Sequence, residues 1–313
     1  MKWSEDCWFL SGATASGKTD VGVALARQLD AEVLSLDSMT LYRGMDIGTA
    51  KPDQACRQAV PHHLIDICEP TEEFSLSNYL EAAEPIVADI RQRGKRPLFV
   101  GGTPLYLKAL LRGVDTGPPA DWAFRKEVEQ EVERVGVAAL HERLQQVDPL
   151  AAAKLPPTDV RRIIRALEVY RATGKPISHV QMHFEEGVPA EQRHVFVLRW
   201  PRETQYQRIE QRVDRMFADG LVEEATALQQ KYGELSRTAA QAVGYREVYD
   251  HLEGRQTLEE TMQRIKTRTR RFAKRQGTWF RGLSECRFVD LEESASPENV
   301  AQAIMEQAAT GGT

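Results

Sequence analysis

The 313-residue sequence has no long hydrophobic run and few cysteines, and both absences narrow the class of protein. No apolar stretch approaches the roughly 20 residues that a membrane-spanning helix needs. The first apolar stretch, residues 7–10, follows two acidic residues and is too short for a signal peptide. The four cysteines, at positions 7, 56, 68 and 286, form no Cys-x-x-Cys pair, which argues against a zinc ribbon or a redox motif. We therefore expect reduced thiols and a cytoplasmic protein.

Internal repeats and low-complexity tracts are also missing. Hydrophobic residues make up 42% of the chain and charged residues 28%, as in a soluble globular protein. This balance excludes a disordered, a collagen-like or a coiled-coil chain. At about 150 residues per domain, the length predicts two domains.

The chain has no excess of positive charge overall, but its basic residues are unevenly distributed. Lysine and arginine total 41 against 46 acids, a net charge of −5. Residues 264–281 carry eight positive charges and no acid, so the remainder carries −13. The global charge argues against a nucleic-acid partner, whereas this local basic segment is of the kind that binds phosphates. The alternative is a solvated helix face.

Hydrophobic patterning predicts an α/β protein. A strand at 6–11, a helix ending near residue 29 and a strand at 32–36 form a βαβ unit, whose strands are parallel. Residues 121–180 are helical throughout, without a strand signal. We predict a parallel-sheet core with a phosphate-binding loop, formed by residues 1–114 and 194–313, and an all-helical insertion at 115–193. The further predicted elements are strands at 64–67, 97–100, 194–200 and 287–289, helices at 79–93 and from 104, and helices between 200 and 280.

Between the first strand and the first helix stands the pattern Gly-x-x-x-x-Gly-Lys-Thr. Its glycines let several backbone N–H groups point at one anion, and the helix N-terminus adds partial positive charge. The lysine neutralises phosphate oxygens, and the hydroxyl of Thr19 can bind Mg²⁺. The alternative is a glycine-rich turn with a surface lysine. The predicted diphosphate-binding residues are Gly12, Ala13, Thr14, Ala15, Ser16, Gly17, Lys18 and Thr19.

Asp37 and Ser38 end the second strand, where open α/β sheets bind ligands. A carboxylate there can hold Mg²⁺ or take a proton from a nucleophile. The alternative is a turn or helix cap. Because a phosphate loop does not identify the phosphate carrier, these residues alone leave a kinase, an ATPase and an enzyme of another diphosphate open.

Further segments identify the family. Residues 37–52, Asp-Ser-Met-Thr-Leu-Tyr-Arg-Gly-Met-Asp-Ile-Gly-Thr-Ala-Lys-Pro, resemble the signature of the tRNA dimethylallyltransferases, also called tRNA isopentenyltransferases. The resemblance covers nearly the whole chain. It includes the phosphate loop and residues 61–66, 100–106, 165–170, 207–212, 243–246 and 271–276.

Two residues depart from this family's pattern. The family usually has proline where Ala13 stands, and many members have glutamine at Thr40. We expect the first to change loop stiffness and the second to alter a nucleic-acid contact. The sequence shows no carboxy-terminal zinc-finger extension, which resembles the bacterial members of the family.

The resemblance implies transfer of a dimethylallyl group from its diphosphate to N6 of the adenosine 3′ of the tRNA anticodon. Lys18, the loop and Mg²⁺ would stabilise the departing diphosphate, and an arginine would complete the clamp. Arg208 and Arg212 are candidates, with Arg212 the stronger match. By resemblance, Asp37 is the base that takes the proton from N6. Thr103 would hydrogen-bond in the same region, unless it only caps the following helix.

The resemblance also implies contacts with the tRNA anticodon stem-loop. The helical insertion and residues 241–246 would contribute, and the basic segment would attract phosphates independently of sequence. The predicted tRNA-binding residues are Asp37, Ser38, Met39, Thr40, Thr103, Arg125, Arg161, Arg162, Ile163, Ile164, Arg165, Gln241, Ala242, Val243, Gly244, Tyr245, Arg246, Arg270, Arg271 and Lys274.

Three other functions compete with tRNA prenylation: a small-molecule kinase, a prenyltransferase acting on free adenine nucleotides, and a non-catalytic RNA-binding module. The basic segment and the insertion argue against a mononucleotide acceptor, and the phosphate loop argues against a module without catalysis. His62 and His63 are adjacent and lack partner ligands, so we expect a packing or polar role rather than a metal site. We expect a monomer, since nothing in the sequence demands a dimer.

Overall fold

The structure is a computed structural model that describes residues 2–113, 117–180 and 187–310. It divides into two compact units. Unit 1 comprises Met1–Leu111 and Gly187–Thr313, and unit 2 comprises Arg112–Glu186. The sequence predicts the insertion at 115–193, and residue 115 lies outside the described residues. No helix among the described residues is long and apolar enough to cross a membrane.

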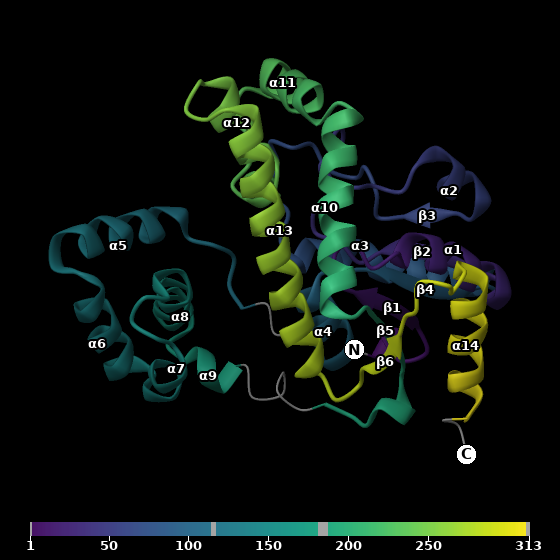
Figure 1. The fold of residues 1–313 in the computed structure, drawn as a ribbon. Helices are drawn as coiled ribbons and strands as arrows, with labels where there is room; N and C mark the ends of the chain where they lie inside the picture. The colour runs from purple at the N-terminus through teal and green to yellow at the C-terminus, as the bar shows by residue number, and fades with distance from the viewer. Residues whose placement is uncertain (1, 114–116, 181–186, 311–313) are drawn as a thin grey trace. The chain divides into compact units, whose positions relative to one another are not determined.

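Unit 1 is built on a parallel sheet whose described strands run in the order β3-β2-β4-β1-β5-β6 (Figure 1). All pairings are parallel, and β1 lies between β4 and β5. This confirms the predicted α/β fold with a parallel sheet. The strands are β1 (Trp8–Gly12), β2 (Ala31–Ser35), β3 (His62–His63), β4 (Arg96–Gly101), β5 (His194–Arg199) and β6 (Arg287–Asp290).

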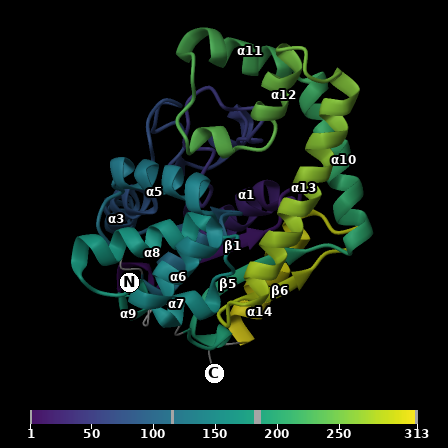
Figure 2. The ribbon, with the colours of Figure 1, turned by 90° about the vertical axis from the view of Figure 1, so that its left-hand side faces the viewer.

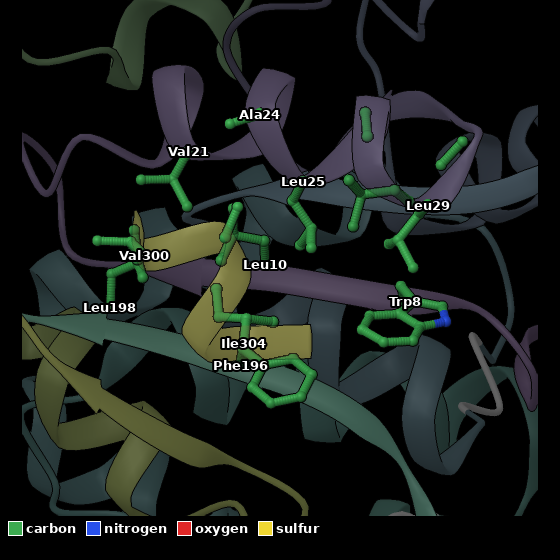
Figure 3. Packing of buried hydrophobic residues seen from close by; sticks show 14 of the residues in the cluster. Trp8, Leu10, Val21, Ala24, Leu25, Leu29, Phe196, Leu198, Val300 and Ile304 are labelled. Carbon is green, nitrogen blue, oxygen red and sulfur yellow. The ribbon is translucent and has the colours of Figure 1, made fainter. Parts of the chain in front are cut away.

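Helices cover the sheet on both faces. α1 (Lys18–Leu29) packs beside α14 (Pro297–Thr310). Figure 3 shows Leu25 of α1 and Ile304 of α14 directed toward Leu10 of β1, and all three side chains are fully buried. Full burial of one such side chain stabilises the fold by roughly 1.5–3 kcal/mol. The spacing of Val21, Leu25 and Leu29 along α1 therefore fixes which face of this helix meets the sheet.

Helix α3 packs on β4, whereas α10 to α13 extend beyond the sheet, and α10 and α13 run side by side (Figures 1 and 2). A second apolar cluster, which includes Tyr42, Leu221, Tyr245 and Ile265, joins these helices to the segment after β2. The helices are α2 (Gln54–Ala59), α3 (Leu76–Gln92), α4 (Pro104–Arg112), α10 (Arg202–Ala218), α11 (Leu221–Tyr232), α12 (Tyr245–Leu252) and α13 (Leu258–Arg281), with 3₁₀ turns at Lys2–Ser4, Ala190–Gln192 and Ala239–Gln241.

The described residues of unit 2 are helical and contain no strand. A buried carboxylate organises this unit: Glu168 accepts hydrogen bonds from the Arg125 guanidinium at 2.8 Å and from the Asp121 backbone N–H at 2.7 Å, and it also pairs with Arg165. The helices are α5 (Trp122–Val135), α6 (Val137–Val147), α7 (Pro149–Lys154), α8 (Val160–Thr173) and α9 (Ile177–Val180).

The predicted strand at 64–67 is wrong. The edge strand instead covers His62–His63, because Leu64 and Asp66 have left-handed backbone angles, φ 60° and 56°, that interrupt an extended chain. His63 Nε2 hydrogen-bonds Glu32 Oε2 at 2.7 Å, and His62 Nδ1 bonds the Val60 carbonyl oxygen. These are the polar contacts expected of the histidine pair.

The four cysteines, all of them among the described residues, form no disulfide. Burial raises the pKa of Cys7 to about 12, so this thiol stays protonated at neutral pH. Among the described residues, no cluster of three or more His, Cys, Asp or Glu side chains is placed to hold a metal ion.

Gly101, the last residue of β4, is packed closely against the backbone of Leu36. A Cβ atom there would lie 2.2 Å from the Leu36 carbonyl oxygen, so Gly101→Ala should destabilise the protein by at least about 3 kcal/mol through overpacking. Gly277 is the matched control, because a Cβ there meets only the Arg281 side chain at 3.5 Å. Gly277→Ala in the helix interior should stabilise by up to about 1 kcal/mol. Urea unfolding midpoints measure both changes. Equal midpoints for the two variants would contradict the close packing of Gly101 against Leu36.

Candidate active site

The phosphate loop occupies the carboxyl end of the central strand. Residues 12–19 join β1 to α1, and Gly17 (φ 86°) and Ala15 (φ 63°) adopt left-handed backbone angles. For Ala15 this conformation costs of order 1–2 kcal/mol, so the surroundings must hold it. Gly12 has no room for a side chain, since a Cβ would lie 2.9 Å from the Leu198 carbonyl oxygen.

Side chains from outside hold the carbonyl groups of this loop. Gln205 Nε2 donates to the Thr14 oxygen at 2.6 Å, and Arg208 Nε donates to the Ala15 oxygen at 3.0 Å. Trp200 Nε1 donates to the third carbonyl, that of Ser16, at 3.0 Å. Sequence reasoning missed Gln205 and Trp200, because these contacts span almost two hundred residues.

Several donors of the loop are left over. Among the described residues, the backbone N–H groups of Gly17, Lys18 and Thr19 have no hydrogen-bond acceptor, as is usual for the first turn of a helix. The buried hydroxyl of Ser16 also has no partner. A buried donor without an acceptor is costly, so these donors are suited to binding an anion.

Two cations lie beside these donors. Lys18 Nζ donates to the Ala13 carbonyl at 3.3 Å, and Arg212 Nη1 donates to Thr14 Oγ1 at 3.4 Å. Burial and the nearby Arg212 lower the pKa of Lys18 to about 8, and burial also lowers the pKa of Arg212. Within the described part of the chain, neither cation forms an ion pair. The loop is therefore a positively charged site that favours a multiply charged anion, and both Arg208 and Arg212 contact it.

Asp37 and Thr103 follow neighbouring strands of the same sheet edge. Asp37 Oδ1 accepts a hydrogen bond from the Met39 N–H at 2.9 Å, and Thr103 Oγ1 accepts one from the Ser38 N–H at 3.1 Å. The negative charge of Asp37 acts in the opposite direction to burial and raises the pKa values of Lys18 and Arg212. The Thr103 hydroxyl thus supports the segment that contains Asp37. The Thr103 carbonyl oxygen accepts hydrogen bonds from N–H groups in the first turn of α4.

Thr40 is a correction to the predicted nucleic-acid contacts. Its hydroxyl is buried and pairs with the Ser35 hydroxyl at 2.7 Å. A residue that points into the core cannot present its side chain to RNA, so the departure at Thr40 affects internal packing. Ser38 and Met39 are half-buried.

Residues 241–246 divide into buried and exposed positions. Ala242 and Tyr245 are buried in the second apolar cluster, and the Tyr245 hydroxyl donates to Glu224 at 2.7 Å. Their side chains are therefore structural, contrary to the prediction. Val243 is partly buried and Gly244 is buried, whereas Gln241 and Arg246 are exposed.

In unit 2 the predicted tRNA-facing residues also separate. Ile163 and Ile164 are buried in the core of this unit, which excludes their side chains from a surface. Arg125 and Arg165 are held by Glu168. Arg161 and Arg162 are exposed, and Arg162 pairs with Asp159. A helix with arginines every third or fourth position mixes core-bound and exposed cations, and the sequence alone does not distinguish them.

The basic segment lies on α13, and neighbouring helices neutralise part of it. Lys266 pairs with Asp214 of α10 at 2.5 Å, and Arg270 pairs with Glu210. Arg264 and Arg268 pair with acids of α12. Of the described cations on this helix, Arg271, Lys274, Arg275 and Arg281 are exposed and have no acidic partner. Arg270, which is predicted to bind tRNA, thus already has an acidic partner, and its contact with RNA stays a prediction.

An open cleft of about 550 Å³ is lined by residues of α12 and α13. Arg268 there is close enough to Arg246 that the second charge lowers the pKa of the first, after the effect of burial. The cleft therefore favours an anion despite the ion pairs at its wall. Its lining residues are Arg246, Gln263, Arg264, Thr267, Arg268 and Arg271.

Lys18 gives a test of the loop's electrostatics. An anion bound beside Lys18 should raise its lowered pKa toward the ordinary value, so binding at about pH 9 should be accompanied by proton uptake. Calorimetry of inorganic diphosphate binding in buffers of different ionisation enthalpy measures this uptake. Wild-type protein should take up as much as about one proton more than Lys18→Met, since the titration of diphosphate itself is common to both. Equal uptake would mean that Lys18 is charged before binding.

Comparisons with known proteins agree with this geometry. The IPP transferase family profile matches residues 40–283, and the isopentenyl transferase profile matches residues 5–63. The tRNA dimethylallyltransferase of Rhodopirellula baltica is 49% identical over 308 residues, 96% of this chain and 92% of the relative. That of Pelotomaculum thermopropionicum is 44% identical over 94% of each chain.

Solved structures give the same result. The full-length tRNA isopentenylpyrophosphate transferase of Bacillus halodurans superposes with a TM-score of 0.71 at 39% identity, covering 98% of this chain and 97% of the other. A eukaryotic dimethylallyltransferase acting on tRNA superposes with a TM-score of 0.78 at 28% identity, covering 96% and 77%. Because the likeness extends over nearly the whole chain, the protein belongs to the tRNA dimethylallyltransferase family of prenyl-transferring enzymes.

Proposed function

We propose that this enzyme transfers a dimethylallyl group from dimethylallyl diphosphate to N6 of the adenosine 3′ of the anticodon in tRNA. The observation that carries the proposal is that Lys18 and Arg212 contact the phosphate loop and have no acidic partner among the residues that the structure describes. They share a sheet edge with the carboxylate of Asp37, which follows β2. The names of the relatives supply the donor and acceptor classes.

The first requirement is a good leaving group. The bond between the allylic carbon and the diphosphate oxygen breaks, and that oxygen takes the electron pair. Lys18, Arg212 and the N–H groups of the first turn of α1 can hold the charge as it develops, which lowers the barrier more than binding the substrate alone. The hydroxyl of Ser16, which lacks an acceptor, is a further donor to the same anion.

The second requirement is a base. The N6 amine is a weak nucleophile, because its lone pair is delocalised into the purine. As the new carbon–nitrogen bond forms, the amine must lose a proton, and Asp37 is the carboxylate available to accept it. Thr103 positions Asp37 through its hydrogen bond with the Ser38 N–H. When the RNA binds, the target adenine must leave its stack to reach the site.

Mg²⁺ fits this site as an ion shared with the substrate. The described residues offer no cluster of three metal ligands, but magnesium is commonly held by one or two protein oxygens together with substrate phosphates. The Thr19 hydroxyl, in the first turn of α1, would be the protein ligand. When bound, the ion would add positive charge next to the diphosphate oxygens.

The RNA partner would be attracted by charge. Exposed cations of α13 and the cleft beside α12 support phosphate contacts, as do the exposed Arg161 and Arg162 of unit 2. We also propose a cytoplasmic monomer, consistent with a soluble RNA substrate. A kinase would share the loop, but the family relationship favours prenyl transfer.

The reaction can be tested directly. Purified protein is incubated with dimethylallyl diphosphate and an anticodon stem-loop, and the nucleosides are analysed by mass spectrometry for N6-modified adenosine. Parallel reactions with AMP, and with ATP and small acceptors, distinguish the nucleotide prenyltransferase and the kinase. Asp37→Asn should lower the rate by about 10² or more while diphosphate and RNA binding persist, as expected for a lost base. Asp30→Asn, a surface control, should leave the rate unchanged, and an active Asp37→Asn would remove Asp37 from the mechanism.

The salt dependence of RNA binding tests the assignment of charges on α13. Two double variants are compared. One combines Arg271→Gln with Lys274→Gln, and the other combines Arg270→Gln with Lys266→Gln. The first pair lacks acidic partners, so its loss should lower the slope of log K against log salt by about 1.4, at about 0.7 per phosphate contact. The second pair is already balanced by Glu210 and Asp214 and should change the slope less. Equal effects of the two pairs would contradict the assignment.

A further inference from the structure

Gln276 is a buried amide within the basic helix. It lies on α13, and only 3% of its surface is exposed, although Lys274, Arg275 and Thr278 around it are exposed. Burying an amide is unfavourable unless both of its ends are hydrogen-bonded. Its contacts therefore indicate what it is there to hold.

Both ends of the Gln276 amide are occupied. Nε2 donates to the Gly102 carbonyl at 2.6 Å, and Oε1 accepts a hydrogen bond from the Thr14 N–H at 2.9 Å. One end therefore requires a donor and the other an acceptor. An amide supplies both, whereas a carboxylate supplies only acceptors and a hydrocarbon supplies neither.

The two backbone groups belong to different parts of the active site. Thr14 lies in the phosphate loop, and its hydroxyl receives the hydrogen bond from Arg212. Gly102 directly precedes Thr103, which braces the Asp37 segment. The junction is tightly packed, because a Cβ on Gly102 would lie 2.8 Å from Gln276 Nε2 and 3.2 Å from the Gly12 carbonyl oxygen.

We propose that Gln276 is a positioning residue that sets the separation between the diphosphate loop and the Asp37–Thr103 edge. The inference rests on the proposed prenyl transfer, in which donor carbon and acceptor nitrogen must be aligned across that separation. Gln276 also withdraws the Thr14 N–H from the diphosphate, so the anion is bound by the later amides of the loop. Because Arg271 and Lys274 lie on the same helix, the bridge connects an RNA-attracting surface directly to the reaction centre.

Steady-state kinetics of Gln276→Met tests the role in alignment. This change keeps the side-chain volume and removes both hydrogen bonds, so kcat should fall by about 10², the scale of a small misplacement of reacting groups. KM for each substrate should stay within about threefold, because the binding residues remain. Gln205→Met is the matched control: Gln205 is also buried and bonded to Thr14, but it does not reach the Gly102 turn. Its main effect should be a higher KM for dimethylallyl diphosphate.

Gln276→Glu supplies a readout that a purely structural role would not move. Once protonated, the introduced carboxyl group can donate to the Gly102 carbonyl and accept from Thr14, as the amide does. The activity of Gln276→Glu relative to wild type should therefore rise as the pH falls, while the relative activity of Gln276→Met stays constant. Dividing by the wild-type rate at each pH removes the pH effects that the variants share with the wild type. Parallel profiles for both variants, or wild-type kcat in Gln276→Met, would overturn the proposal.

Amide hydrogen exchange tests the bridge without any activity measurement. In Gln276→Met, exchange should increase about tenfold or more at both the phosphate loop and the Gly102–Thr103 turn, because each loses its link to α13. In Gln205→Met the increase should be confined to the loop. An unchanged turn in Gln276→Met would overturn the inference. An inactive wild type would instead count against the proposed function, and the exchange pattern would still decide the bridge.

Discussion

The rest of the site depends on two neighbouring cations that no acid pairs with in the described part of the chain. Lys18 and Arg212 repel each other, and burial makes both charges harder to maintain. A fold tolerates such a pair only when other contacts fix the backbone around it. Here the carbonyl groups of Thr14, Ala15 and Ser16 are each tied to a side chain that lies beyond residue 199. In the proposed reaction, the same two charges would stabilise the leaving diphosphate.

The central part of the fold could be predicted from the sequence, because it depends on local patterns. The strand at 6–11 and the helix after it are specified by an apolar run, a glycine-rich turn and apolar residues at helical spacing. The edge strand could not be placed in this way. Leu64 and Ile65 are strand-forming residues by composition, but the left-handed turns at Leu64 and Asp66 are set by tertiary contacts, such as the ion pair between Asp66 and Lys51.

The candidate site shows the same division. The phosphate loop, Asp37 and Arg212 are found from motifs, and the structure brings the loop and Arg212 into contact. Charge balance on α13 was not predictable, because the acids that neutralise Arg270 and Lys266 lie on another helix, more than fifty residues earlier in the chain. Ile163 and Ile164 are predicted to bind tRNA, yet they are core residues of unit 2. A motif indicates that a position requires a certain residue type. It does not indicate whether the residue packs in the core or contacts a ligand.

Tyr245 illustrates how a packing residue can still matter for a ligand. Its ring lies so close to Gly48 that a Cβ there would be 2.6 Å away, and its hydroxyl bonds Glu224. The Glu224 carboxylate in turn accepts hydrogen bonds from the backbone N–H groups of Asp46, Ile47 and Gly48. Arg246, the next residue after Tyr245, lines the anion cleft. Tyr245 and Glu224 thus link the chain beside the cleft to residues 46–48, which lie in the segment that follows Asp37.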